Sequence, residues 1–188
     1  MTVADPPRQL EEEDASRRHI DLTPASSIKV RPIHWLWRNR LPVGELSLLA
    51  GREDIGKSTL GYTFIAWITT GTMKGKYLGQ PRAVLVAASE DSWAHTIVPR
   101  LMGAGANLDL VFRVDVVTSD GFDGSLDLPR DLQAVEQAAR SVDAVFLLLD
   151  PLMSRLSSTL APTRMPRSGA PSSRSPTSAI GLGWPYSA

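Results

Sequence analysis

Eight consecutive residues, Gly51 to Ser58, have the types and spacing of a loop that binds phosphate groups. They match the pattern G-x-x-x-x-G-K-S/T, in which Gly51 and Gly56 allow a tight turn and a close approach of the backbone. The N–H groups of such a loop, together with the start of the next helix, attract an anionic phosphate. Lys57 would reach the β- and γ-phosphates, and Ser58 would offer its hydroxyl to Mg²⁺. The loop therefore predicts binding of a nucleoside triphosphate with magnesium.

The middle of this loop is unusually acidic for a phosphate site, because Glu53 and Asp54 bring two carboxylates into it. Arg52 offsets one of these charges, and aspartate tolerates left-handed backbone geometry. We expect the acidic pair to weaken nucleotide affinity without abolishing the motif. The complete stretch assigned to nucleotide binding is Gly51, Arg52, Glu53, Asp54, Ile55, Gly56, Lys57, Ser58 and Thr59.

Two further carboxylates follow apolar segments. Asp150 ends the apolar run 145–149 and would hold the hydration shell of Mg²⁺. Glu90 follows the apolar segment 83–88, where it would orient or deprotonate the attacking water. Asp91 competes for that role, and either acid would also suit the first turn of a helix, where it complements the dipole. The predicted catalytic residues are Glu90 and Lys57, and the predicted metal ligands are Ser58 and Asp150.

The elements that must position these side chains can be read from the apolar patterning. Continuously apolar segments that alternate with helical ones are typical of an α/β fold with a parallel sheet buried on both faces. Ser89 is the expected N-cap of the second helix. Strands are expected at residues 46–50, 83–88, 111–117 and 145–149, and helices at 57–70, 90–104 and 129–141.

Composition limits the function classes. The 188 residues are 43% hydrophobic and contain no cysteine, which excludes disulfides, thiol nucleophiles and cysteine-ligated metals. Twenty Lys and Arg balance twenty Asp and Glu, which argues against a strongly electrostatic nucleic-acid or membrane module, though not against a local basic patch. No apolar run approaches 18 residues and no secretory signal begins the chain, so the expected location is the cytoplasm.

The chain divides into three parts by composition. Residues 1–28, with acids at 11–14, predict a disordered arm, and residues 29–160 predict the globular core. Residues 161–188 contain five prolines, many serines and no acid, which predicts a disordered tail without helix or strand.

The order of motifs resembles that of RecA-like AAA-type P-loop ATPases related to the plasmid replication helicase RepA. The resemblance covers residues 29–158. It implies a RecA-like core, ATP and Mg²⁺ as cofactors, frequent ring assembly, and work on DNA, single-stranded DNA included. By this resemblance Glu90 matches the catalytic glutamate and Asp150 the Walker B aspartate, while Trp35 and Trp37 are interpreted as core or subunit-packing aromatics. The motifs are Trp35-Leu36-Trp37, Gly44-Glu45-Leu46, the phosphate-binding loop, Ser89-Glu90-Asp91, Arg100-Leu101 and Leu149-Asp150-Pro151-Leu152.

In that family the strand after the Walker B strand lies between it and the strand of the phosphate-binding loop, and it carries a polar sensor residue. Here the Pro/Ser-rich tail stands in its place, with no candidate sensor or arginine finger. Back-translating residues 162–188 and shifting the frame by two nucleotides can yield an amphipathic helix and an apolar strand, so we hypothesise a frameshift near residues 159–162. The alternative is a natural disordered tail.

The resulting expectation is an incomplete ATPase domain with a gap between strands 46–50 and 145–149. Such a chain would be poorly soluble and would have little or no ATPase activity. The alternative function is a nucleotide-responsive regulatory or partner-binding protein that does not hydrolyse ATP. A small-molecule kinase is disfavoured because no lid or acceptor site is visible.

Overall fold

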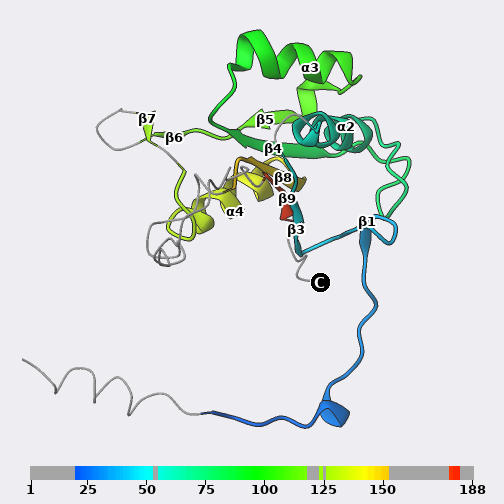
Figure 1. The fold of residues 1–188 in the computed structure, drawn as a ribbon. Helices are drawn as coiled ribbons and strands as arrows, with labels where there is room; N and C mark the ends of the chain where they lie inside the picture. The colour runs from blue at the N-terminus through cyan, green and yellow to red at the C-terminus, as the bar shows by residue number, and fades with distance from the viewer. Residues whose placement is uncertain (1–19, 53–54, 118–122, 125, 153–177, 183–188) are drawn as a thin grey trace, which may run out of the picture. The chain divides into compact units, whose positions relative to one another are not determined.

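The computed structural model describes residues 20–52, 55–117, 123–124, 126–152 and 178–182 (Figure 1). The chain forms two units, Met1–Pro32 and Ile33–Ala188. The described part of the first unit holds one short 3-10 helix, η1 (Ala25–Ser27), without buried side chains. All predicted site residues belong to the second unit.

A five-stranded sheet forms the centre of the second unit, in the order β3-β9-β8-β4-β5. Strands β4, β5 and β8 run parallel, whereas β9 is antiparallel to both of its neighbours. Side chains are buried along nearly the whole of β4 and β8, as continuously apolar sequences require. The parallel α/β sheet predicted from the sequence is therefore confirmed for three strands. Their bounds are β3 (Leu46–Leu49), β4 (Ala83–Ala88), β5 (Val111–Arg113), β8 (Ala144–Asp150) and β9 (Ser178–Leu182).

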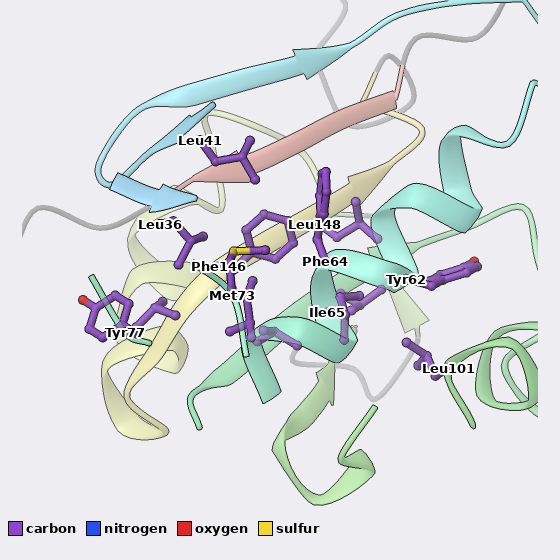
Figure 2. Close-up of a cluster of buried hydrophobic side chains, with 14 of the residues drawn as sticks. Leu36, Leu41, Tyr62, Phe64, Ile65, Met73, Tyr77, Leu101, Phe146 and Leu148 are labelled. Atoms are coloured by element: carbon purple, nitrogen blue, oxygen red, sulfur yellow. The ribbon is translucent and has the colours of Figure 1, made fainter. Parts of the chain in front are cut away.

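Helices cover the two faces of this sheet. On one face α2 (Lys57–Thr69) packs Phe64 and Ile65 against Phe146 and Leu148 of β8 (Figure 2). On the other face α4 (Leu132–Ser141) packs against the alternate β8 residues Leu147 and Leu149. Alternation along one strand thus supplies both cores, because successive strand side chains point to opposite faces. The helices predicted at 57–70 and 129–141 are confirmed, the second from residue 132 onward.

The predicted helix 90–104 begins later than expected. It consists of a π-helical turn, η2 (Trp93–Ile97), followed by α3 (Val98–Gly103). Its N-cap is Ser92, whose Oγ accepts a hydrogen bond from the His95 N–H, and not Ser89 as predicted. Glu90 and Asp91 consequently precede the helix and lie in the turn that follows β4.

The predicted strand 111–117 is divided. After the 3-10 turn η3 (Leu108–Leu110), β5 ends at Arg113, and β6 (Val116–Val117) pairs instead with β7 (Asp123–Gly124). A second small sheet, β1 (Trp35–Trp37) with β2 (Leu41–Pro42), packs on the α2 side through Leu36 and Leu41. Trp37 contacts Phe64 and Trp67 of α2 edge-on, which agrees with a packing role for this aromatic.

Strand β9 overturns the expectation of a tail without a strand and of a gap in the sheet. Ile180 lies opposite Ser47 on one side and Leu148 on the other, so β9 occupies the position between β3 and β8. The segment 178–182 is short and mostly apolar, and its backbone pairs groups on β3 and β8 that would otherwise have no partners. Because β9 is antiparallel, it enters the sheet at the edge where β8 ends.

Candidate nucleotide-binding site

The loop between β3 and α2 requires glycine at position 56. Gly56 is the N-cap of α2 and has a φ of 85°, in the left-handed region that favours glycine. At Gly51 an added Cβ would lie 2.3 Å from Cδ1 of Ile55, so the exposed Ile55 side chain would have to move. Arg52, Ile55 and Thr59 are exposed around this turn, while the predicted Glu53 and Asp54 lie outside the described residues.

Lys57 is folded back over the loop that precedes it. Its Nζ donates hydrogen bonds to the carbonyl oxygens of Gly51, at 3.1 Å, and Arg52, at 2.5 Å. The ammonium group is therefore held at the mouth of the loop, at the start of α2 where the helix dipole also favours an anion. A phosphate oxygen placed there would compete with these carbonyls for the same N–H donors.

Ser58 and Asp150 come together across the sheet. Ser58 Oγ donates a hydrogen bond of 2.7 Å to Oδ2 of Asp150, and both side chains are partly buried. Hydroxyl and carboxylate oxygens are the hard ligands that Mg²⁺ prefers, and adjacent ligands of octahedral Mg²⁺ lie about 2.9 Å apart. This pair therefore fits the metal predicted for it. Groups of three or more metal-ligating side chains are absent from the described part of the chain, so the remaining ligands would be phosphate oxygens and water.

The turn after β4 brings Glu90 to the same edge of the sheet. The Ser89 N–H donates to the Asp150 carbonyl at 3.3 Å, which ties the ends of β4 and β8 together. Glu90 follows directly, is exposed, and has neither a hydrogen bond nor an ion pair with any residue that the structure describes. Asp91 instead lies 3.5 Å from Nη1 of Arg100. Of the two competing carboxylates, Glu90 is thus the one left available for water or ligand.

Sequence reasoning missed Tyr62, whose buried phenol interacts electrostatically with Asp150. Burial raises the pKa of Tyr62, the nearby Asp150 and Asp91 raise it further, and a hydrogen bond with Arg100 opposes them. The phenol therefore stays neutral and links α2 to Arg100, which in turn faces Asp91. One signal could have found it: Tyr62 is four residues after Ser58, on the same face of the helix.

Residues 12–161 match the model of the AAA domain family. Neither the curated proteins nor the solved structures contain a match to this chain. No helix within the described ranges has the length and apolar character needed to cross a membrane.

Proposed function

Because the chain belongs to the AAA domain family, an AAA-type group of P-loop ATPases, we propose that it binds ATP with Mg²⁺ at the loop 51–58. The observation that carries this proposal is the hydrogen bond between Ser58 and Asp150, since it unites the loop with the strand-end carboxylate. In this proposal the N–H groups at the start of α2 and the Lys57 ammonium bind the phosphates. Ser58 and Asp150 hold the metal ion, which when bound neutralises charge on the β- and γ-phosphates.

We also propose the activity of the family that the motifs resemble, which is ATP hydrolysis coupled to work on DNA in a RepA-like manner. Glu90 would position or deprotonate the attacking water, because it is exposed beside the ends of β4 and β8. Self-association into a ring, which the same resemblance implies, would accompany this activity. The order of the motifs along residues 29–158 supports this finer assignment.

Turnover in this chain is proposed to be slow or absent. The frameshift hypothesis accounts for a tail with five prolines and no acid, and the antiparallel direction of β9 supports it, since a RecA-like sheet would place a parallel strand there. An altered strand beside Asp150 would leave ATP binding intact while removing groups that read the γ-phosphate.

The alternative is a nucleotide-responsive regulatory or partner-binding protein that does not hydrolyse ATP. One observation favours it: Lys57 is already engaged by the carbonyls of Gly51 and Arg52. A bound nucleotide would release Lys57 from these contacts and change the conformation of the loop. This conformational change could signal nucleotide binding without ATP hydrolysis.

Titration with a fluorescent ATP analogue, followed by steady-state ATPase measurements with and without single-stranded DNA, tests both functions. Binding that requires Mg²⁺ and Lys57 supports the nucleotide site, and DNA-stimulated turnover then supports the RepA-like activity. Binding without turnover supports the regulatory alternative. Absence of ATP binding by the folded chain would refute both.

A further inference from the structure

A basic surface lies at the opposite end of α2 from the nucleotide-binding loop. The turn at residues 70–82 connects the end of α2 to the start of β4, whereas the loop 51–58 precedes α2. The 13 residues of α2 separate the two ends by about 20 Å. This surface, which we call the basic edge, is therefore distinct from the nucleotide site. Its cations are Arg38, Arg40, Lys74, Lys76 and Arg82.

The first of two hollows on the basic edge is apolar inside and basic at its rim. It has a volume of about 420 Å³, and its inner residues are Trp37 and Leu78, the latter 58% exposed. Trp37 is fixed from behind by Phe64 and Trp67. The complete lining is Trp37, Arg38, Asn39, Lys74, Gly75 and Leu78.

The backbone of this hollow is tightly connected. The Arg38 N–H donates to the Lys74 carbonyl at 2.8 Å, and the Lys76 N–H donates to the Trp35 carbonyl at 2.7 Å. Gly75 is required between them, because a Cβ there would lie 2.0 Å from the carbonyl oxygen of Leu36. The cations at the rim are thus presented by a preformed scaffold, which reduces the ordering cost of binding.

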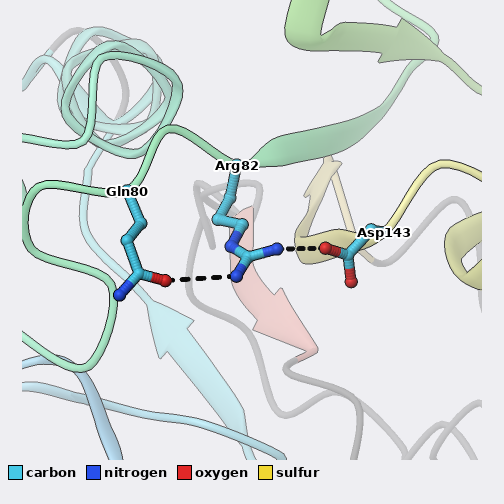
Figure 3. A network of polar contacts seen from close by, with 3 residues as sticks. All are labelled: Gln80, Arg82 and Asp143. Atoms are coloured by element: carbon cyan, nitrogen blue, oxygen red, sulfur yellow. Dashed lines mark hydrogen bonds and ion pairs between the residues drawn. The ribbon is translucent and has the colours of Figure 1, made fainter.

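The second hollow, of about 380 Å³, lies on the same turn and is lined by Lys76, Tyr77, Gln80, Arg82 and Asp143. Lys76 and Arg82 lie over the ring of Tyr77, at 5.3 and 5.1 Å from its centroid. Arg82 is also fixed by Asp143 and by Gln80 (Figure 3). Tyr77 is only 7% exposed, and its hydroxyl has no hydrogen-bond partner among the described residues. This hollow therefore places the side chains of Lys76 and Arg82 together over Tyr77, and Asp143 offsets the charge of Arg82.

The charge of the basic edge is concentrated locally. The stretches 33–44 and 55–89, which contain its five cations, contain no Asp or Glu, although the whole chain has no net charge. Within the part of the chain that the structure describes, Arg38, Arg40 and Lys74 form no ion pair. Their charge is consequently available to an anionic partner.

We propose that the basic edge binds single-stranded nucleic acid, with phosphates along its cations and a base in the hollow of Trp37 and Leu78. A single strand offers both features at once, a regular row of phosphates and bases whose apolar faces are accessible, whereas a duplex conceals those faces. An acidic protein segment would satisfy the cations and leave the apolar hollow unused. This inference deepens the DNA-directed part of the proposed function but rests on residues outside the nucleotide site.

Fluorescence anisotropy of a labelled oligothymidylate of about 20 nucleotides, with the full chain and no ATP, tests the proposal. Arg38→Glu, Lys74→Glu and Leu78→Ala are each expected to weaken binding at least about tenfold. Arg130→Glu is the matched control, because Arg130 is an exposed arginine that lines neither hollow, and it should change affinity far less. Arg38→Ala should reduce the slope of log K against log salt concentration by about 0.7. Arg38 and Leu78 are exposed, so these variants should keep the far-ultraviolet circular dichroism of the parent chain.

Three results would overturn the proposal. One is an equal loss of binding in Arg38→Glu and Arg130→Glu. The second is binding of an abasic strand as tight as that of oligothymidylate, which would show that no base occupies the hollow. The third is competition by polyglutamate as strong as that by oligothymidylate, which would point to an acidic protein partner instead. Lys57→Ala should bind the strand as tightly as the parent chain does. An error in the assignment of the nucleotide site would therefore alter ATP binding alone, and an error in the assignment of the basic edge would alter strand binding alone.

Discussion

The hydroxyl of Ser58 and the carboxylate of Asp150 are 2.7 Å apart although 92 residues separate them in the chain. The contact requires that β3, which leads into α2, and β8 belong to one sheet at a fixed separation. Strand β9 supplies that separation, because it lies between them and pairs with both. The position of the loop relative to Asp150 thus depends on β9, a strand contributed by the Pro/Ser-rich tail.

Ser58→Ala is expected to reduce the dependence of ATP binding on Mg²⁺. The substitution removes one of the two oxygens that fit the metal, together with the hydrogen bond from Ser58 to Asp150, a change worth about 1.5–3 kcal/mol. Ser58→Thr keeps the hydroxyl and serves as the control. Titrations of a fluorescent ATP analogue with Mg²⁺ and with a chelator check this, and an unchanged effect of the chelator in Ser58→Ala would contradict the assignment.

Lys57→Ala should weaken ATP binding by about 1.5–3 kcal/mol, because a charge-assisted contact with phosphate is lost. The same change in Lys76, an exposed lysine beyond the far end of α2, should leave ATP affinity nearly unaltered. Titration calorimetry measures both. Equal affinities of Lys57→Ala and the parent chain would rule out the loop as a phosphate site.

Glu90→Gln is expected to keep ATP binding and to lose turnover wherever turnover is measurable. Removal of a general base typically lowers rates by about 10²–10⁴-fold. Asp91→Asn should have a smaller effect, since Asp91 faces Arg100 and Glu90 does not. Steady-state phosphate release at saturating ATP separates the two carboxylates, and the reverse order of effects would show that Asp91 is the base.

Elements with a strong local signal were predictable from the sequence. Local sequence alone determines the apolar strands β4 and β8 and the start of α2 after Gly56. The predicted bounds of these three elements agree with the structure to within one or two residues. The start of the α3 region has no single local signal, because Ser89 and Ser92 are both good N-caps and the acids between them suit a first helical turn. Only tertiary contacts select Ser92.

Features that depend on distant partners were not predictable in this way. The five apolar or small residues at 178–182 have no local pattern that predicts a strand in a proline-rich segment. They form one because the edges of β3 and β8 provide backbone hydrogen-bond partners for them. The contact of Tyr62 with Arg100 likewise joins two helices whose relative placement no local pattern specifies. The candidate site was predictable because its residues follow strands that meet at one edge of a parallel sheet.

Tyr62→Phe should alter the dependence of stability on pH. Burial and the carboxylates raise the folded-state pKa of Tyr62 above its ordinary value of 10.0. The contribution of Tyr62 to the free energy of unfolding is therefore complete below pH 10.0. It is lost as pH rises above the unfolded value toward the folded one, since the unfolded chain releases the proton first. The free energy of unfolding in urea should therefore fall less steeply above about pH 10 in Tyr62→Phe than in the parent. Identical slopes would show that Tyr62 ionises alike in both states.

Ile180→Pro is expected to destabilise the whole second unit and to abolish the site together with it. Ile180 is paired on both sides, with Ser47 and Leu148, so proline there removes a ladder hydrogen bond and places its ring inside a central strand. A buried backbone group left without its partner costs about 1–3 kcal/mol, a large part of the roughly 5–15 kcal/mol by which domains are stable. Ile180→Val retains the backbone donor and a β-branched side chain, and it should melt within a few degrees of the parent chain. Thermal melts followed by circular dichroism, with ATP-analogue binding measured on the same samples, check the prediction. If Ile180→Pro melted like Ile180→Val and still bound nucleotide, β9 would not be what holds β3 and β8 in register.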